Sequence, residues 1–127
     1  MRFYQVVMPL VVAAMALAQS SAQVNMDSAS LAPNGAPGVD VQVDVSYPPG
    51  VSGSLKFNLL RFNVQNQSWV VVSTSESATN TGGLNQQFRV LFNATPQAGD
   101  KVEAVVTPDD GTGDSTSNQV TIPAPPE

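Results

Sequence analysis

The chain has 127 residues, of which 42% are hydrophobic and 12% charged, a formal net charge of −5, and neither histidine nor cysteine. This composition predicts one folded domain and excludes stabilisation by disulfides. The acidic balance disfavours nucleic acid and anionic membranes as partners, because both need a basic patch on the protein.

Residues 1–22 have the pattern of a secretory signal peptide, with Arg2 ahead of an uncharged apolar run and a small polar stretch behind it. Two positions fit the small-x-small cleavage rule, one with the cut before Gln19 and one with the cut before Gln23. A membrane anchor is disfavoured, because the apolar run of about 13 residues contains Pro9 and is shorter than the roughly 20 residues that span a bilayer. We therefore expect a protein secreted to the extracellular space or the cell wall, without membrane insertion.

Residues 23–122 form a succession of short predicted strands, and a proline-rich tail follows at residues 123–127. The segment from Gln23 to Ser30 either forms a first strand or trails as a tail. From Val39 to Tyr47 apolar and polar residues alternate strictly, which is typical of a strand with one buried and one wet face. Outside the leader no window has the sustained periodicity of a helix.

The next predicted unit is a hairpin. Its first strand carries Leu55, Phe57 and Leu59 in one phase, and the phase then shifts, which indicates a bulge near Leu59 and Leu60. A polar turn follows, and Trp69 to Thr74 return as the second strand.

A long polar connection without a strand is expected from Ser75 to Gln86, because this segment has two glycines and no apolar periodicity. Strands are then predicted from Gln87 to Thr95, from Lys101 to Thr107 and, after a loop, from Gln119 to Ile122. About seven strands separated by turn signals predict an all-β fold, a single antiparallel sandwich of two sheets.

Four segments carry a resemblance to known domains: GSLKFNLLR at 53–61, VVVSTSES at 70–77, PQAGDKVEAVVTP at 96–108 and TSNQVTI at 116–122. Their order resembles an immunoglobulin-like or fibronectin-type β-sandwich of about seven strands. It is also similar to the Kre9/Knh1-type N-terminal domain of fungal secreted cell-wall proteins. The resemblance implies a sandwich with a role in cell-wall assembly.

An acidic loop precedes the last predicted strand, with Asp109, Asp110 and Asp114 among glycines and hydroxyl residues. One interpretation is a weak calcium site, because calcium is held by carboxylate and carbonyl oxygens on a backbone kinked by glycine. The spacing does not match an EF-hand, since no acid follows Asp114 until Glu127. The favoured interpretation is a turn between two strands, and no other cofactor is expected.

Two asparagines match the acceptor motif for N-glycosylation, Asn66 in NQS and Asn93 in NAT. Both lie at predicted junctions between a strand and a turn. In a secreted chain from a eukaryote these positions predict a glycoprotein.

Catalysis is not expected from this sequence. The serines have no histidine or nearby lysine to act as a base, which removes the usual route to acyl transfer. Asp40 and Asp44 share one strand face but lie about 13 Å apart by the rise per residue, too far for a pair of glycosidase carboxylates.

The protein is therefore expected to be a monomer that recognises an extracellular protein or a polysaccharide. The loops from Ser73 to Leu84 and from Pro108 to Asn118 are the expected contact elements. Tyr47 and Trp69 are the aromatic candidates, with Trp69 favoured in the core because a lone tryptophan in a small sandwich is usually buried. Two alternatives are a carbohydrate-binding module and a secreted factor that binds a host protein.

Overall fold

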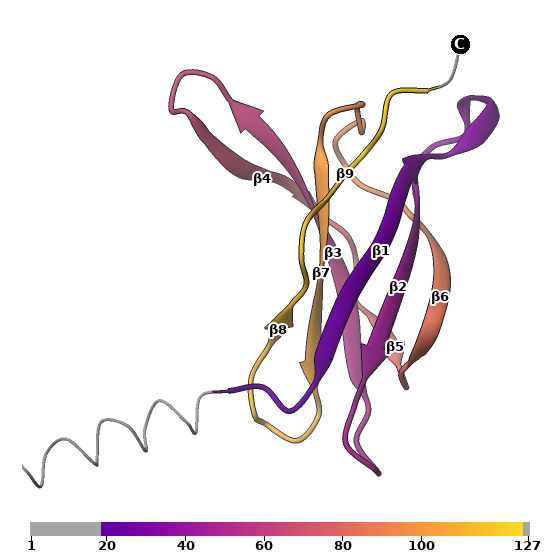
Figure 1. Cartoon of the computed structure of the whole chain (residues 1–127), viewed down its shortest axis with the longest axis vertical. Helices are drawn as coiled ribbons and strands as arrows, with labels where there is room; N and C mark the ends of the chain where they lie inside the picture. The colour runs from indigo at the N-terminus through magenta and orange to yellow at the C-terminus, as the bar shows by residue number, and fades with distance from the viewer. Residues whose placement is uncertain (1–18, 126–127) are drawn as a thin grey trace, which may run out of the picture.

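The computed structural model describes residues 19–125 and shows two antiparallel β-sheets (Figure 1). Within this range the strands are β1 (Gln23–Leu31), β2 (Val39–Ser46), β3 (Gly53–Asn63), β4 (Ser68–Thr74), β5 (Ala78–Asn80), β6 (Gly83–Val90), β7 (Lys101–Pro108), β8 (Ser115–Thr116) and β9 (Val120–Thr121). A short 3-10 helix, η1 (Pro33–Gly35), lies between β1 and β2. One sheet has the order β1-β2-β6 and the other β4-β3-β7-β8, with β5 paired to β3 and β9 to β7.

The all-β class and the antiparallel sheets are confirmed. Residues 1–18 of the leader predicted at residues 1–22 lie outside the described residues. Between residues 19 and 125 no helix is long and apolar enough to cross a membrane. The segment from Gln23 to Ser30 is a strand, because β1 pairs along its length with β2.

The connection expected from Ser75 to Gln86 without a strand is wrong, since it contains β5 and the start of β6. Most residues of these two strands are exposed, so their sequence lacks the apolar alternation by which a strand is recognised. The side chain of Asn80 accepts a hydrogen bond from Gly82 N at 2.9 Å in the turn between them. The following strand ends at Val90, earlier than the predicted Thr95.

The core lies between the two sheets and is built from alternating positions. Every second residue of β2, from Val39 to Val45, is at most 3% exposed, as the alternation predicts. The second sheet contributes the buried side chains Leu55, Phe57, Leu59, Val102, Ala104 and Val106. Full burial of a valine, leucine or phenylalanine side chain stabilises the fold by about 1.5–3 kcal/mol.

The bulge predicted near Leu59 and Leu60 is confirmed in position, but the extra residue lies on β4 and not on β3. The register passes from Leu59 opposite Ser73 to Leu60 opposite Val71, so the extra residue is Val72 on β4. Bulges bend a strand and increase its twist. Beyond this point the β3–β4 hairpin leaves the body of the sandwich, at the upper left of Figure 1.

On one side of the sandwich an amide side chain links the two sheets. Asn118, between β8 and β9, accepts a hydrogen bond from Met26 N at 2.8 Å and donates one to Met26 O at 3.0 Å. Met26 is buried in β1, next to the bulge at Asp27. The amide satisfies both backbone groups as a neighbouring strand would, and it ties the smaller sheet to the larger one.

Candidate recognition surface

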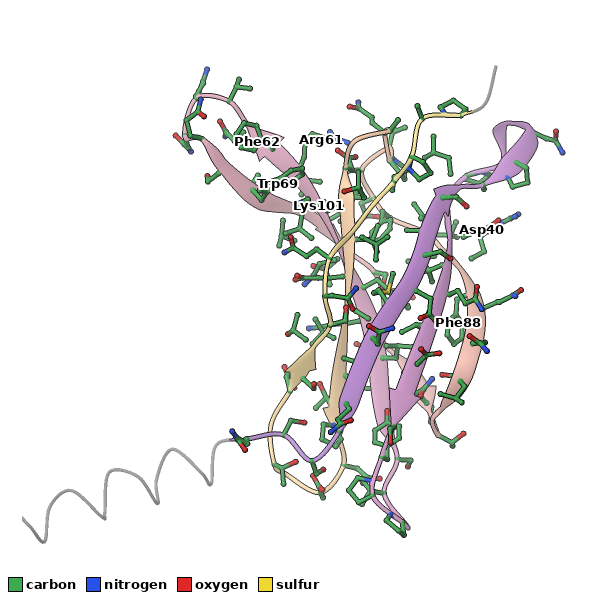
Figure 2. All side chains as sticks on the ribbon, viewed as in Figure 1. Asp40, Arg61, Phe62, Trp69, Phe88 and Lys101 are labelled. Atoms are coloured by element: carbon green, nitrogen blue, oxygen red, sulfur yellow. The ribbon has the colours of Figure 1, made fainter. Side chains whose placement is uncertain are left out.

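The end of the β3–β4 hairpin is a protruding, uncharged and largely apolar segment. Residues 62–72, called the arm below, contain no Asp, Glu, Lys or Arg. Six of their apolar side chains are exposed: Phe62, Val64, Trp69, Val70, Val71 and Val72. Figures 1 and 2 show the arm extending past the edge of the smaller sheet, which therefore does not cover it.

The expectation that Trp69 fills the core is wrong, because Trp69 lies on the arm and is 37% exposed to solvent. Trp69 lies opposite Phe62, and the two rings meet edge to face with centroids 5.5 Å apart. The ammonium group of Lys101 lies 4.3 Å from the centre of a Trp69 ring, a cation–π contact (Figure 2). These contacts hold the indole in one orientation on the sheet surface.

The base of the arm is fixed by an ion pair between Arg61 and Asp100. Arg61 donates to the two carboxylate oxygens of Asp100 at 3.0 and 2.8 Å, and to the carbonyl oxygen of Thr95 at 2.9 Å. Asp100 is 3% exposed and also accepts a hydrogen bond from Gln97 N at 2.9 Å. Burial raises the pKa of Asp100, but the hydrogen bonds from Arg61 and Gln97 outweigh it, so the pKa lies below its ordinary value.

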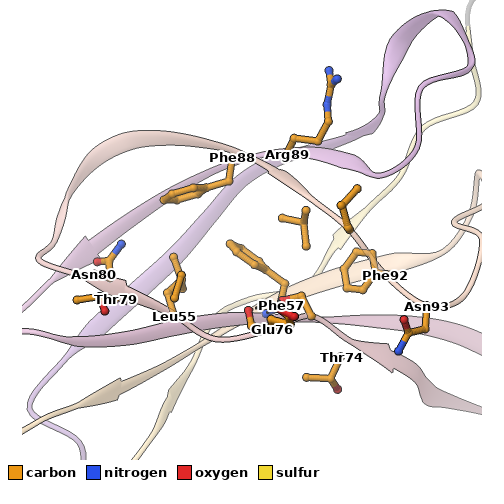
Figure 3. Close-up of a pocket in the computed structure, with 14 residues that line it drawn as sticks. Leu55, Phe57, Thr74, Glu76, Thr79, Asn80, Phe88, Arg89, Phe92 and Asn93 are labelled. Atoms are coloured by element: carbon orange, nitrogen blue, oxygen red, sulfur yellow. Dashed lines mark hydrogen bonds between the residues drawn. The ribbon is translucent and has the colours of Figure 1, made fainter.

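A second feature is an open cleft of about 360 Å³ between β6 and the β3–β5 pair (Figure 3). Phe57 and Phe88 face each other across it with ring centroids 6.2 Å apart. Leu55 and Phe92 extend the apolar wall, and Asn93 stands on the rim. The phenyl groups give the cleft an apolar floor, which suits an apolar group better than a charged one.

The two loops expected to make contacts both reach the end of the fold where β3 begins. Gly53 of β3 pairs with Asn80 on one side and with Pro108 on the other. The segment from Ser73 to Leu84 then borders the cleft, and the segment from Pro108 to Asn118 packs against β1. Both loops are held by strand pairing or side-chain hydrogen bonds, and neither presents a tryptophan.

Tyr47 is half-buried against the core rather than presented to solvent. Its ring lies against Gly82, whose φ of +91° and close neighbours disfavour a larger side chain. Its buried hydroxyl has no hydrogen-bond partner among the described residues. Burial, with the Asp109 carboxylate as the second cause, raises the pKa of the Tyr47 phenol.

The three aspartates of the acidic loop hold separate partners. Asp109 accepts from Ser52 Oγ at 3.1 Å, and Asp114 accepts from Thr107 Oγ1 at 2.7 Å. Asp110 accepts hydrogen bonds from Ser21 Oγ and from both the hydroxyl and N–H of Thr112. These hydrogen bonds lower the pKa of Asp110. Between residues 19 and 125 no three acidic side chains gather in a way that could hold a metal ion.

Both glycosylation motifs lie on the surface. Asn66 is exposed in the turn at the tip of the arm, between β3 and β4. Asn93 is exposed shortly after β6, where its N–H donates to Ser73 Oγ at 3.0 Å. Each side chain is therefore placed where an attached glycan would meet solvent.

The two carboxylates of β2, Asp40 and Asp44, lie on its solvent-exposed face. The sequence did not predict that Asp27 lies beside Asp44. Asp40 is paired with Arg89 at 2.8 Å, whereas Asp44 accepts from Asn85 N at 2.7 Å. The bulge in β1 brings Asp27 beside Asp44. Burial and the Asp44 carboxylate raise the pKa of Asp27, while the Asn85 N–H lowers the pKa of Asp44.

The arm was missed as a site because each of its residues suits a strand. A usable signal was present in the three consecutive valines at 70–72, which break the alternation expected of a half-buried strand, and in the absence of charge around them.

Comparison with protein-family models, with curated proteins and with solved structures finds no match to this chain.

Proposed function

We propose that this is a secreted, non-catalytic protein with an immunoglobulin-like β-sandwich that acts by surface recognition in the extracellular space or the cell wall. The arm is its contact surface. The observation that carries the proposal is the joint exposure of Phe62, Trp69 and Val71 on an uncharged hairpin that extends from the sandwich.

Packing within the chain does not account for these apolar residues. Single exposed apolar side chains are ordinary on protein surfaces, but a contiguous group marks contact with another molecule. Val71 is 50% exposed and Val64 is 70% exposed, so polar residues at either position would cost the fold little. Their apolar character is explained by a partner that covers them.

The grouping of strands supports the finer assignment of the sandwich. In immunoglobulin-type domains the first, second and fifth strands share one sheet, and the third, sixth and seventh share the other. With β5 counted as an addition, β1, β2 and β6 match the first group, and β3, β7 and the β8–β9 segment match the second. The fourth strand, β4, departs from the constant-domain pattern by pairing with β3. The similarity to the Kre9/Knh1-type domain supports a place in the cell wall.

The contacts of residues 20–22 support cleavage of the leader before Gln19 rather than before Gln23. Ala22 is buried in the core cluster, and Ser21 donates hydrogen bonds to Thr112 and Asp110. A cut before Gln23 removes these contacts, whereas a cut before Gln19 keeps them. Amino-terminal sequencing of protein from the medium or the cell wall is expected to begin at Gln19, and intracellular protein that keeps residues 1–18 would contradict secretion.

A binding assay tests the arm as the contact surface. Purified protein is incubated with a cell-wall fraction and, separately, with immobilised extracellular proteins, and retention is compared between wild type, Trp69→Ala and Leu84→Ala. Leu84 is 79% exposed on the other sheet, so its removal matches the loss of an exposed apolar side chain away from the arm. We expect Trp69→Ala alone to lose retention. Equal retention of all three proteins would reject the arm.

Carbohydrate binding is the second candidate, because an exposed indole is a suitable surface for stacking a sugar ring. Here the ring is held by Phe62 and Lys101, and part of it remains exposed. Retention on insoluble glucan or chitin that is lost in Trp69→Ala would favour this candidate. Retention only on extracellular or host proteins would favour protein recognition.

A further inference from the structure

The outer edge of β4 has no neighbouring strand among residues 19–125, because β4 is the last strand of its sheet. Such an edge directs backbone N–H and C=O groups to solvent, and most proteins protect it with charge, proline or a bulge. Within β4 the bulge at Val72 protects only one end. The stretch from Ser68 to Val71 is unprotected, and residues 62–75 contain neither charge nor proline.

A second copy of the same strand fits this edge in an antiparallel pairing. Trp69 and Val71 lie on one face of β4, since they pair with Phe62 and Leu60, and Val70 lies on the other face. A two-fold axis through Val70 places Trp69 of each copy opposite Val71 of the other. Aromatic and β-branched residues form favourable cross-strand pairs, and this interface closes with two copies.

Charge also favours contact through the arm. The full chain carries a formal net charge of −5, so two copies repel each other, and the repulsion is weaker when they meet at a neutral surface than at a charged one. The charged groups at the base of the arm are already engaged, Arg61 with Asp100 and Lys101 with the ring of Trp69. A polar foreign strand would leave the apolar side chains of β4 without apolar partners, whereas the second copy supplies them.

We propose that the protein forms a two-fold dimer in which the β4 strands of two copies pair antiparallel and join their larger sheets into one. The proposal rests on the proposed function in assigning the arm to contacts with another chain. It departs from the monomer expected from the sequence. Pairing at the edge leaves one face of each Phe62–Trp69 pair open, so the dimer presents two recognition surfaces and gains avidity for a repetitive partner.

Sedimentation equilibrium of purified protein expressed from the full chain tests the dimer over a wide concentration range. We expect a monomer–dimer equilibrium that Val71→Lys weakens by about tenfold or more, because each lysine replaces an apolar side chain opposite Trp69 of the other copy and the two lysines are diagonal neighbours across the axis. Leu84→Lys adds the same charge at an exposed position on β6 and is expected to leave the equilibrium unchanged. Thermal melts confirm that both variants fold. A monomer at all concentrations, open-ended aggregation, or an unchanged Val71→Lys dimer would overturn the proposal.

Single cysteines test the pairing register, because the chain has no cysteine of its own. Val70→Cys lies on the proposed axis and is expected to form an intermolecular disulfide on mild oxidation. Leu84→Cys is the control and is expected to remain a thiol, so equal yields from both variants would overturn the register. If the protein is monomeric but its retention still depends on Trp69, the dimer alone is rejected. If a dimer forms but retention is independent of Trp69, the proposed function alone is rejected.

Discussion

The carboxylate of Asp100 receives two hydrogen bonds from the guanidinium of Arg61, and the aspartate is almost fully buried where the arm joins the sandwich. Asp100→Asn leaves Arg61 without its charged partner, and we expect the free energy of unfolding to fall by about 2–3 kcal/mol. Urea unfolding measures the change. Asp40→Asn is the matched control, because the exposed Asp40–Arg89 pair is expected to contribute only about 0–1 kcal/mol. Equal losses would show that burial gives Asp100 no special weight.

The same pair predicts how stability depends on pH. The pKa of Asp100 is lower in the folded protein than its ordinary value of about 3.9. Its stabilising effect is therefore present above the unfolded pKa and is lost as pH falls through the folded pKa. Between about pH 5 and pH 2 we expect wild type to lose more stability than Asp100→Asn. Urea unfolding at each pH measures the free energy of unfolding of both proteins. An equal loss of stability in the two proteins as pH falls would contradict this assignment.

The amide of Asn118 is predicted to hold the two sheets together at Met26. Asn118→Ala leaves a buried N–H and C=O without their partners, so we expect a loss of about 1–3 kcal/mol. Hydrogen exchange at the Met26 amide should also become faster. Asn25→Ala is the control, because Asn25 is exposed and bonds only to carboxylates on the outer face of the sheet. An unchanged exchange rate at Met26 would contradict the role of Asn118.

The fluorescence of Trp69 reports directly on the arm, because it is the only tryptophan in the chain. We expect acrylamide to quench the folded protein readily at low protein concentration, where the proposed dimer dissociates. The urea-unfolded protein gives the limit of full exposure. A blue-shifted emission that resists quenching would show that Trp69 is buried and would contradict the exposed arm.

The acidic loop is predicted not to bind calcium, since Asp109, Asp110 and Asp114 hold separate hydrogen-bond partners. Thermal unfolding should occur at the same temperature with calcium, with magnesium and with chelator. A rise in melting temperature with calcium alone that is lost in Asp110→Asn would contradict this prediction and establish a calcium site.

Glycosylation is predicted at Asn66 and Asn93, because both side chains are exposed in acceptor motifs. In protein from a eukaryotic secretory host, Asn66→Gln and Asn93→Gln should each remove the mass of one glycan. Ser68→Ala and Thr95→Ala keep the asparagines but destroy the motifs, so they should give the same losses. A glycan mass that survives these changes would contradict the assignment.

The buried parts of the fold were predictable because their sequence alternates. The strict alternation of apolar and polar residues from Val39 to Tyr47 predicts β2, since one face of the strand meets the core and the other meets solvent. β5 and the start of β6 gave no such signal, because strands with exposed faces need no apolar period. The count of about seven strands separated by turn signals predicted two antiparallel sheets, and two are present among residues 19–125.

The sequence offers Trp69 as a candidate and the valines at 70–72 as a signal, but the exposure of the whole arm depends on contacts between distant residues. Whether Trp69 is buried depends on where the smaller sheet ends relative to the bulge at Val72, and no local pattern contains that relationship. The pairing of Arg61 with Asp100 joins residues 39 positions apart, and that of Asn118 with Met26 joins residues 92 positions apart. Such pairs follow from the packed topology rather than from the residue types.

The most direct test of the arm as the recognition surface is hydrogen exchange of the protein free and bound to the cell-wall or extracellular material that retains it. We predict slower exchange on binding in residues 62–72, with the amides of β4 most affected. Protection confined to the Ser73–Leu84 and Pro108–Asn118 segments, with the arm unchanged, would contradict the account.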